Sequence, residues 1–198
     1  MKLLLTMAVI LTPLFSQSLD DAVQSYEKKD YKAAELALRD LINADPENGR
    51  AQLYLGLALA SQGKTKDAKP ALLKARGLLK DSDAAEVGLA KAYIDERDFD
   101  KAQQSLDSAR SINPDNPDLP FNQGMVDLGR KDYSAAARNL STAAERDPGN
   151  AYAHYYAGLA YNSLKQPDKM IEHFTAFLKM APDAPEAKKV QSILKVVR

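Results

Sequence analysis

The stretch from Asp83 to Asn116, DAAEVGLAKAYIDERDFDKAQQSLDSARSINPDN, decides the fold because its pattern recurs along the whole chain. Positions 34 residues apart carry proline in four of five cases: Pro46, Lys80, Pro114, Pro148 and Pro182. Twelve residues before them stand Ala34, Ala68, Ala102, Ala136 and Met170. A fixed period of this length, without insertion or deletion, predicts one helix–turn–helix unit repeated five times, each unit burying its apolar face against its neighbours.

Fixed positions within each unit also share residue types. In the third unit these positions hold apolar, small or aromatic residues and a final proline: Leu89, Ala90, Tyr93, Phe99, Ala102, Leu106, Ala109 and Pro114. The second unit has Leu55, Gly56, Leu59, Ala68, Leu72 and Ala75, and the fifth has Gly158, Tyr161, Phe174 and Pro182. Over residues 19–184 this set resembles the tetratricopeptide repeat. The resemblance implies an all-α fold, a right-handed superhelical α-solenoid of five helix–turn–helix repeats.

One position in each unit requires a small side chain. Gly56, Gly124 and Gly158 share this position with Ala22 and Ala90. Small residues allow two helix backbones to approach closely, while larger apolar side chains fill the space around them. We therefore expect closely packed helices at this position.

Turn-forming residues and prolines set the boundaries of the units. The two helices of a unit are separated by polar pairs such as Lys29-Asp30 and Lys131-Asp132, and proline, which cannot continue a helix, follows the second helix. The expected repeats are 19–48 (with a shortened first helix), 49–82, 83–116, 117–150 and 151–184, followed by a capping helix at 185–198.

The fourth repeat departs from the pattern. Pro120 stands inside the expected first helix, and Gln123 and Asp127 stand at positions that are apolar or aromatic in the second, third and fifth repeats. We therefore predict that the first helix of this repeat begins late or is rotated. Rotation would place Phe121, Met125 and Leu128 in the core.

The C-terminal segment has the pattern of an amphipathic helix. Asp183 and Glu186 have the spacing of a capping box, with Pro185 in the first turn. An apolar stripe follows at Ala187, Val190, Leu194 and Val197. This indicates a cap over the apolar side of the fifth repeat. The alternative is a detachable helix that binds a membrane or a partner.

Residues 1–18 have the features of a secretory signal peptide. Lys2 is followed by an apolar run from Leu3 to Leu11, and Ser16 and Ser18 are small residues suited to cleavage after Ser18. The run is shorter than the roughly 17–25 residues that a spanning helix needs, so an uncleaved anchor is the lesser interpretation. We expect an exported protein, periplasmic or secreted, with no membrane insertion after cleavage. The alanine-rich, cysteine-free composition suits a bacterium.

Composition and motifs give no sign of catalysis. The 27 basic and 27 acidic residues balance, so no overall field favours nucleic acid or anionic lipid. No cysteine is present, which excludes disulfides and thiolate metal sites. His154 and His173 are interpreted as structural, and no spaced acidic set, glycine-rich loop or nucleophile grouping stands out. We expect no enzymatic activity, no cofactor, no metal site and no nucleic-acid partner.

The first helix of each repeat packs on its own partner and on the preceding repeat, which leaves a third face free. Residues at i, i+4 and i+7 lie on this face. In the resembled family the face lines a concave groove, so the predicted partner-binding residues are Leu53, Leu57, Val87, Lys91, Ile94, Phe121, Met125, Leu128, Tyr152, Tyr155 and Leu159. Such an apolar and aromatic stripe is typical of a surface that binds protein.

The stripe favours a module that binds a peptide or a helix of another protein, as an adaptor or assembly factor of the cell envelope. One alternative is that the stripe packs the interior of the superhelix. A second is a structural subunit that forms a homo-oligomer or a larger complex, and a weaker one is a carrier of an apolar ligand. Lys91 and Asn122 alone do not form the carboxylate clamp of chaperone-binding relatives.

Overall fold

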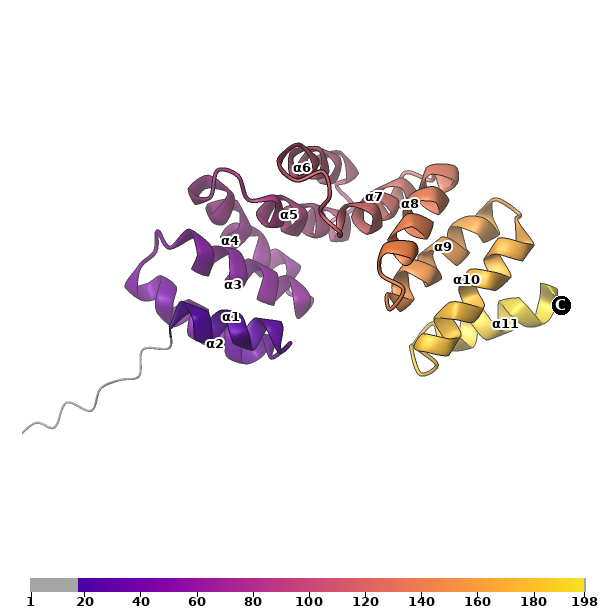
Figure 1. Cartoon of the computed structure of the whole chain (residues 1–198), viewed down its shortest axis with the longest axis horizontal. Coiled ribbons are helices and arrows are strands. Elements are labelled where there is room, and N and C mark those ends of the chain that lie inside the picture. Colours follow the sequence, from indigo (N-terminus) through magenta and orange to yellow (C-terminus); the bar gives the residue numbers. More distant parts are fainter. Residues whose placement is uncertain (1–17, 198) are drawn as a thin grey trace, which may run out of the picture.

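The computed structural model describes residues 18–197, and all secondary-structure elements in this part of the chain are α-helices, joined by turns and short loops. Figure 1 shows the helices stacked as successive pairs along an arch, with α1 and α11 at its two feet. The helices are α1 (Leu19–Glu27), α2 (Tyr31–Ala44), α3 (Gly49–Ser61), α4 (Thr65–Leu78), α5 (Asp83–Asp95), α6 (Phe99–Ile112), α7 (Leu119–Gly129), α8 (Tyr133–Arg146), α9 (Ala151–Ser163), α10 (Pro167–Met180) and α11 (Ala187–Val197). The predicted all-α solenoid is confirmed.

A small residue on the first helix of each repeat meets a large apolar residue on the second. A side chain added at Gly56 would place its Cβ 2.5 Å from Leu72 Cγ, and Gly124 stands in the same relation to Leu140. In the fifth repeat Phe174 fills the space above Gly158. The large residues at this position are all fully buried: Leu38, Leu72, Leu106, Leu140 and Phe174. The helices therefore cross where the sequence has its small residue.

The fourth repeat keeps the common register although its first helix begins late. Helix α7 starts at Leu119, whereas the 34-residue spacing from Asp83 leads to residue 117. Gly124 nevertheless packs on Leu140 as Gly56 packs on Leu72, so α7 is not rotated. The predicted late start is confirmed, and the alternative, a rotated helix that buries Phe121, is wrong.

Polar side chains occupy the interface between the third and fourth repeats. Gln123 of α7 and Gln103 of α6 exchange two amide hydrogen bonds of 2.8 and 3.1 Å. Asp127 accepts a 2.7 Å hydrogen bond from Asn139 of α8 and another from Gln123. The polar residues that broke the sequence pattern thus satisfy one another, which removes the cost of placing them in a helix interface.

The second helices end at one phase of the repeat whether or not proline is present. Helices α2, α6, α8 and α10 stop two residues before Pro46, Pro114, Pro148 and Pro182. Helix α4 stops at Leu78, two residues before Lys80. The boundary therefore does not depend on proline, although proline reinforces it where it is present.

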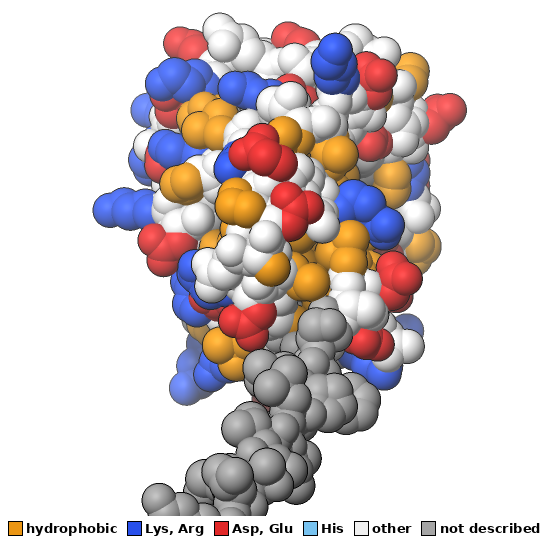
Figure 2. All heavy atoms as spheres, turned by 90° about the vertical axis from the view of Figure 1, so that its left-hand side faces the viewer, with side chains coloured by type: hydrophobic (Ala, Val, Ile, Leu, Met, Phe, Trp, Pro, Cys, Tyr) orange, Lys and Arg blue, Asp and Glu red, His pale blue; other side chains and the backbone are white. Residues whose placement is uncertain are grey.

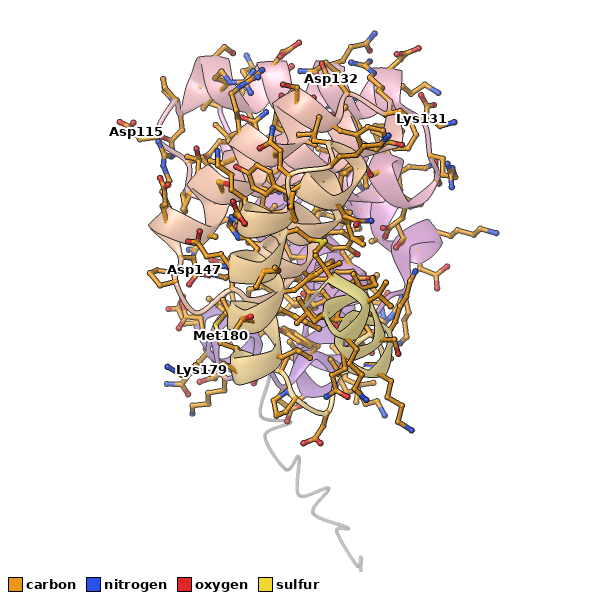
Figure 3. All side chains as sticks on the ribbon, turned by 90° about the vertical axis from the view of Figure 1, so that its right-hand side faces the viewer. Asp115, Lys131, Asp132, Asp147, Lys179 and Met180 are labelled. Carbon is orange, nitrogen blue, oxygen red and sulfur yellow. The ribbon has the colours of Figure 1, made fainter. Side chains whose placement is uncertain are left out.

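The turn inside each repeat contains one residue with left-handed backbone conformation. Its φ is 73° at Gly63 and 64° at Lys131, and Lys29, Arg97 and Lys165 take similar values. Figure 3 shows Lys131 in one such turn and Asp115, which lies between repeats, on the opposite edge of the solenoid. Only the second repeat has glycine at this position, so the other four turns carry a strained side chain.

The C-terminal helix covers the end of the solenoid. Ala187, Val190 and Leu194 are buried, and Val190 and Leu194 belong to the apolar cluster of the last two repeats, as expected for a cap. The helix begins at Ala187. Within residues 18–197, Asp183 and Glu186 do not form the hydrogen bonds of the predicted capping box. Glu186 instead accepts a hydrogen bond from the hydroxyl of Tyr152.

A capping box is present at the other end of the chain. The hydroxyl of Ser18 accepts a 3.1 Å bond from the amide of Asp21, whose carboxylate accepts from the amide and hydroxyl of Ser18. The rest of the predicted signal peptide, residues 1–17, lies outside the described residues. Cleavage directly after Ser18 would remove this cap, a loss that typically costs about 0.5–2 kcal/mol.

The helix crossing gives a test with a matched control. Gly56→Ala should lower the free energy of unfolding by about 1–3 kcal/mol, because the added methyl group collides with Leu72. Gly77→Ala adds the same group to α4 where nothing lies within 4 Å, and should leave stability unchanged or raise it by up to about 1 kcal/mol. Urea unfolding followed by circular dichroism measures both. Equal effects of the two substitutions would contradict the crossing.

The strained turns give a second test. Lys131→Gly should stabilise the protein by about 0.5–1 kcal/mol, because glycine adopts positive φ without a steric cost. Gly63→Ala should destabilise it by about 1 kcal/mol or more for the converse reason. Thermal unfolding of the two variants beside the parent chain checks the opposite signs.

Candidate partner-binding groove

The concave side of the arch holds an open hollow of about 750 Å³, called the groove below. Its walls come mainly from the first helices of the repeats. The last turns of α8 and the loops that precede α7 and α9 also line it. All five repeats contribute a lining residue: Tyr26, Leu57, Ile94, Phe121 and Tyr156. The curvature of the stack thus brings residues of α1 and α9 to the walls of one hollow.

The structure divides the predicted binding residues into three groups. Six line the groove: Leu57, Lys91, Ile94, Phe121, Met125 and Tyr152. Three are buried by the protein itself, namely Leu53, Val87 and Tyr155, with 8, 3 and 7% of their surface exposed. The remaining two, Leu128 and Leu159, are partly buried against the apolar cluster of the last repeats and do not line the groove. The positions of these three buried residues agree with the alternative in which the stripe packs the interior of the superhelix.

In α9 the groove face lies one residue further along the helix than the sequence pattern indicated. Asn122 and Tyr156 line the groove, whereas the residue before Tyr156, Tyr155, points into the core. Sequence reasoning missed these two residues, and also missed Tyr26, Asp95 and Asp118. Because successive helical residues differ by about 100° in direction, a shift of one position decides between core and groove.

Aromatic rings form one wall of the groove. Phe121 of α7 lies edge-on to Tyr156 of α9, with 6.1 Å between ring centroids, and Tyr152 lies 6.2 Å from Tyr156. Tyr152 is 40% exposed, so its ring is open to a binding partner. Beneath it, Tyr155 and Phe177 pack at 5.1 Å and fix the wall from behind.

Carboxylates outnumber cations along the groove. Asp95, Asp118 and Asp147 line it, and Lys91 is the only cationic side chain among the lining residues of the described chain. Lys91 Nζ lies 3.4 Å from Asp118 Oδ2, so the positive charge is already paired. Thr65 donates a 2.7 Å hydrogen bond to Asp95 Oδ2, which orients that carboxylate. The groove therefore combines apolar walls with a negative rim.

Burial and nearby charges raise the pKa of two tyrosines that line the groove, Tyr26 and Tyr156. Burial raises the pKa of Tyr156, and the charges of Tyr155, Glu186, Tyr152 and Asp95 raise it further. Burial likewise raises the pKa of Tyr26, a hydrogen bond with Ser61 lowers it in part, and the charges of Tyr31, Asp118 and Tyr54 raise it further. Raised phenol pKa values keep these hydroxyl groups neutral and available as hydrogen-bond donors.

The two histidines form a cluster behind the groove, between α9 and α10. Their Nδ1 atoms lie 3.0 Å apart, and the Nε2 atom of His173 lies 3.3 Å from Ser141 Oγ. The ring of Tyr161 stacks on His173. Burial lowers the pKa of both histidines, and His154 lowers the pKa of His173 further. This arrangement holds neutral rings in a packed interface.

The described residues contain no group of three or more His, Cys, Asp or Glu side chains suited to a metal ion. Within residues 18–197, no helix combines the length and the apolar character that crossing a bilayer requires. What the groove supplies is an apolar and aromatic surface bordered by oriented polar groups. That chemistry suits non-covalent recognition.

A family model described as the tetratricopeptide repeat matches residues 18–86 and 121–185, and a second model with the same description matches residues 59–119. The chain therefore belongs to the tetratricopeptide-repeat family. Proteins of this family generally act as non-enzymatic scaffolds that bind protein or peptide partners.

One curated relative, tetratricopeptide repeat protein 37 of Xenopus laevis, is 31% identical over 97 residues. The match covers 46% of this chain but only 6% of that much longer protein. It therefore supports the repeat family and carries no further function to this chain.

Solved structures share the fold over most of the chain. The thermophilic protein TTC0263 of Thermus thermophilus superposes with a TM-score of 0.71 at 18% identity, covering 89% of this chain and 96% of its own. MamA gives 0.61 at 25% identity, with coverage of 86 and 92%. YrrB, described as having an unusual peptide-binding site, gives 0.61 at 20% identity, with coverage of 88 and 90%.

The histidine cluster predicts a stability that depends on pH. Because the folded state lowers the pKa of both rings below the usual 6.5, the unfolded chain binds more protons as the pH falls through 6.5. The stabilising contribution is complete above that pH and is lost below it, at most about 1.4 kcal/mol per pH unit for each extra proton. We expect the unfolding temperature to drop between pH 7.5 and pH 5.5.

The matched variant is His154→Gln with His173→Gln, which retains polar side chains without their titration. The drop should be smaller in this variant, while the nearby Glu145, Lys169 and Glu172 remain in both proteins. The same drop in both proteins would assign the pH dependence to other groups.

Proposed function

We propose that this protein is a non-enzymatic interaction module that binds a peptide segment or helix of a partner protein in the groove. One observation carries the proposal: a continuous hollow of about 750 Å³ to which all five repeats contribute partly exposed apolar and aromatic side chains. A chain that used these residues only for its own packing would cover them. Leu57, Ile94 and Met125 instead line an open surface.

The size and position of the groove agree with this role. Segments of partner proteins bind through apolar pockets that take successive side chains, and a surface spread over several repeats supplies such pockets in a row. The likeness of fold to YrrB, described as having a peptide-binding site, adds that a peptide site is compatible with this architecture.

We further propose that the module works outside the cytoplasm, as an adaptor or assembly factor of the cell envelope. This part of the proposal depends on the signal-peptide pattern of residues 1–18. Export followed by cleavage separates the folded repeats from the apolar leader. The partner is then a protein of the same compartment.

Site-specific photocrosslinking in the native host tests the groove. A photoreactive amino acid at Met125 should give covalent adducts with a second protein, because that side chain lies in the wall of the groove. The same amino acid at Leu36, which is 68% exposed on α2 and does not line the groove, is the matched control and should give few adducts. The mass of the recovered protein also reports whether residues 1–18 have been removed.

Two outcomes would overturn the proposal. Equal yields from Met125 and Leu36 would show general surface contact with no preference for the groove. Adducts that contain only a second copy of this chain would favour the alternative of a self-associating structural subunit. Size measurements over a range of micromolar concentrations would then define that assembly.

A further inference from the structure

The charge of the groove differs from the charge of the chain as a whole. The full sequence has equal numbers of basic and acidic residues, yet three aspartates and a single lysine line the groove. Figure 2 shows positive and negative side chains interspersed with apolar ones at the N-terminal end of the solenoid. The excess of negative charge is therefore a local property of the groove, created by the curvature that gathers Asp95, Asp118 and Asp147.

Much of this negative charge is left without a positive partner. Lys91 forms an ion pair with Asp118, and Asp95 is held only by the neutral hydroxyl of Thr65. Asp147 accepts a hydrogen bond from the backbone amide of Gly149. A cationic side chain entering the groove would meet at least two carboxylates that have no cation of their own among the lining residues described.

The aromatic wall favours the same kind of ligand. Phe121, Tyr152 and Tyr156 present ring surfaces to the groove, and ring faces attract lysine and arginine side chains. Asp95 and the three aromatic residues line the same hollow. Arginine suits such a region best because its planar group can stack on a ring while it donates to a carboxylate.

We propose that the groove selects a cationic and apolar protein segment, in which arginine or lysine side chains alternate with apolar ones. The apolar side chains pack on Leu57, Ile94 and Met125, and the cations pair with Asp95 and Asp147, the two lining carboxylates without a cationic partner. This inference rests on the proposed function and names the chemistry of the partner. Charge complementarity decides it: a segment rich in glutamate or aspartate meets repulsion from the rim.

Three synthetic peptides of ten residues test the proposal against the purified full chain. In each peptide leucine alternates with a second residue, which is arginine, glutamine or glutamate. Fluorescence anisotropy should show the arginine peptide binding at least about tenfold more tightly than the glutamine peptide, and the glutamate peptide binding most weakly. Raising the salt concentration should weaken the arginine peptide alone, because it screens partly exposed charges.

Substitutions test whether the preference for the arginine peptide comes from the carboxylates of the groove. Asp95→Asn with Asp147→Asn should weaken the arginine peptide about fivefold to tenfold and leave the glutamine peptide unchanged. Asp115→Asn makes the same chemical change in the α6–α7 loop, where Asp115 lies on the edge of the solenoid and does not line the groove (Figure 3), and should have no effect. Met125→Gln should weaken both peptides, because both use the apolar wall.

The outcomes separate this inference from the proposed function. Equal binding of the arginine and glutamine peptides, unchanged by the double variant, would leave a peptide groove but overturn its preference for cations. Equal losses with Asp115→Asn and the groove variants would also overturn it, since the attraction would then come from the whole surface. Failure of all three peptides to bind more tightly than about 1 mM would overturn both proposals.

Discussion

The close crossing of two helices at a small residue is the constraint on which the rest of the structure depends. At Gly56, Gly124 and Gly158 the facing helix approaches so closely that even a methyl group would collide with Leu72, Leu140 or Phe174. The crossing brings the apolar side chains of each repeat into contact and fixes the angle between its two helices. The first and third repeats carry alanine at this position, Ala22 and Ala90, and both side chains are fully buried. A small residue thus recurs at the crossing in all five repeats, and the repeats stack into the arch of Figure 1.

The curvature produces the groove, which no single repeat could form. Tyr26 and Tyr156 are 130 residues apart in the sequence, yet they line the same hollow. The same gathering concentrates Asp95, Asp118 and Asp147 along one rim of a chain whose total charge is balanced. The packing of the repeats thus also shapes the groove, because the contacts that hold neighbouring repeats together set the distances between the residues that line it.

The fourth repeat shows how much irregularity the array tolerates. Its first helix begins late and carries Gln123 and Asp127 at positions that are apolar elsewhere, but these residues pair with Gln103 and Asn139. The register at Gly124 is unchanged. Satisfied hydrogen bonds thus replace apolar packing at this junction without disturbing the neighbouring repeats, since each repeat contacts mainly its neighbours.

The sequence by itself determined the period, the helices and the helix crossing, because these depend on local patterns repeated in phase. It left a late start and a rotation of α7 as alternatives, and the structure decided between them. It also identified Leu57, Ile94 and Met125 as groove residues, since the free face of a helix follows from its periodicity. Only the tertiary structure decided that Tyr155 is core while Tyr156 faces the groove, and that distant aspartates share a rim with a paired Lys91. The physical reason is that helical periodicity fixes a direction only to within about one residue, whereas the superhelical turn between repeats decides which side chains meet.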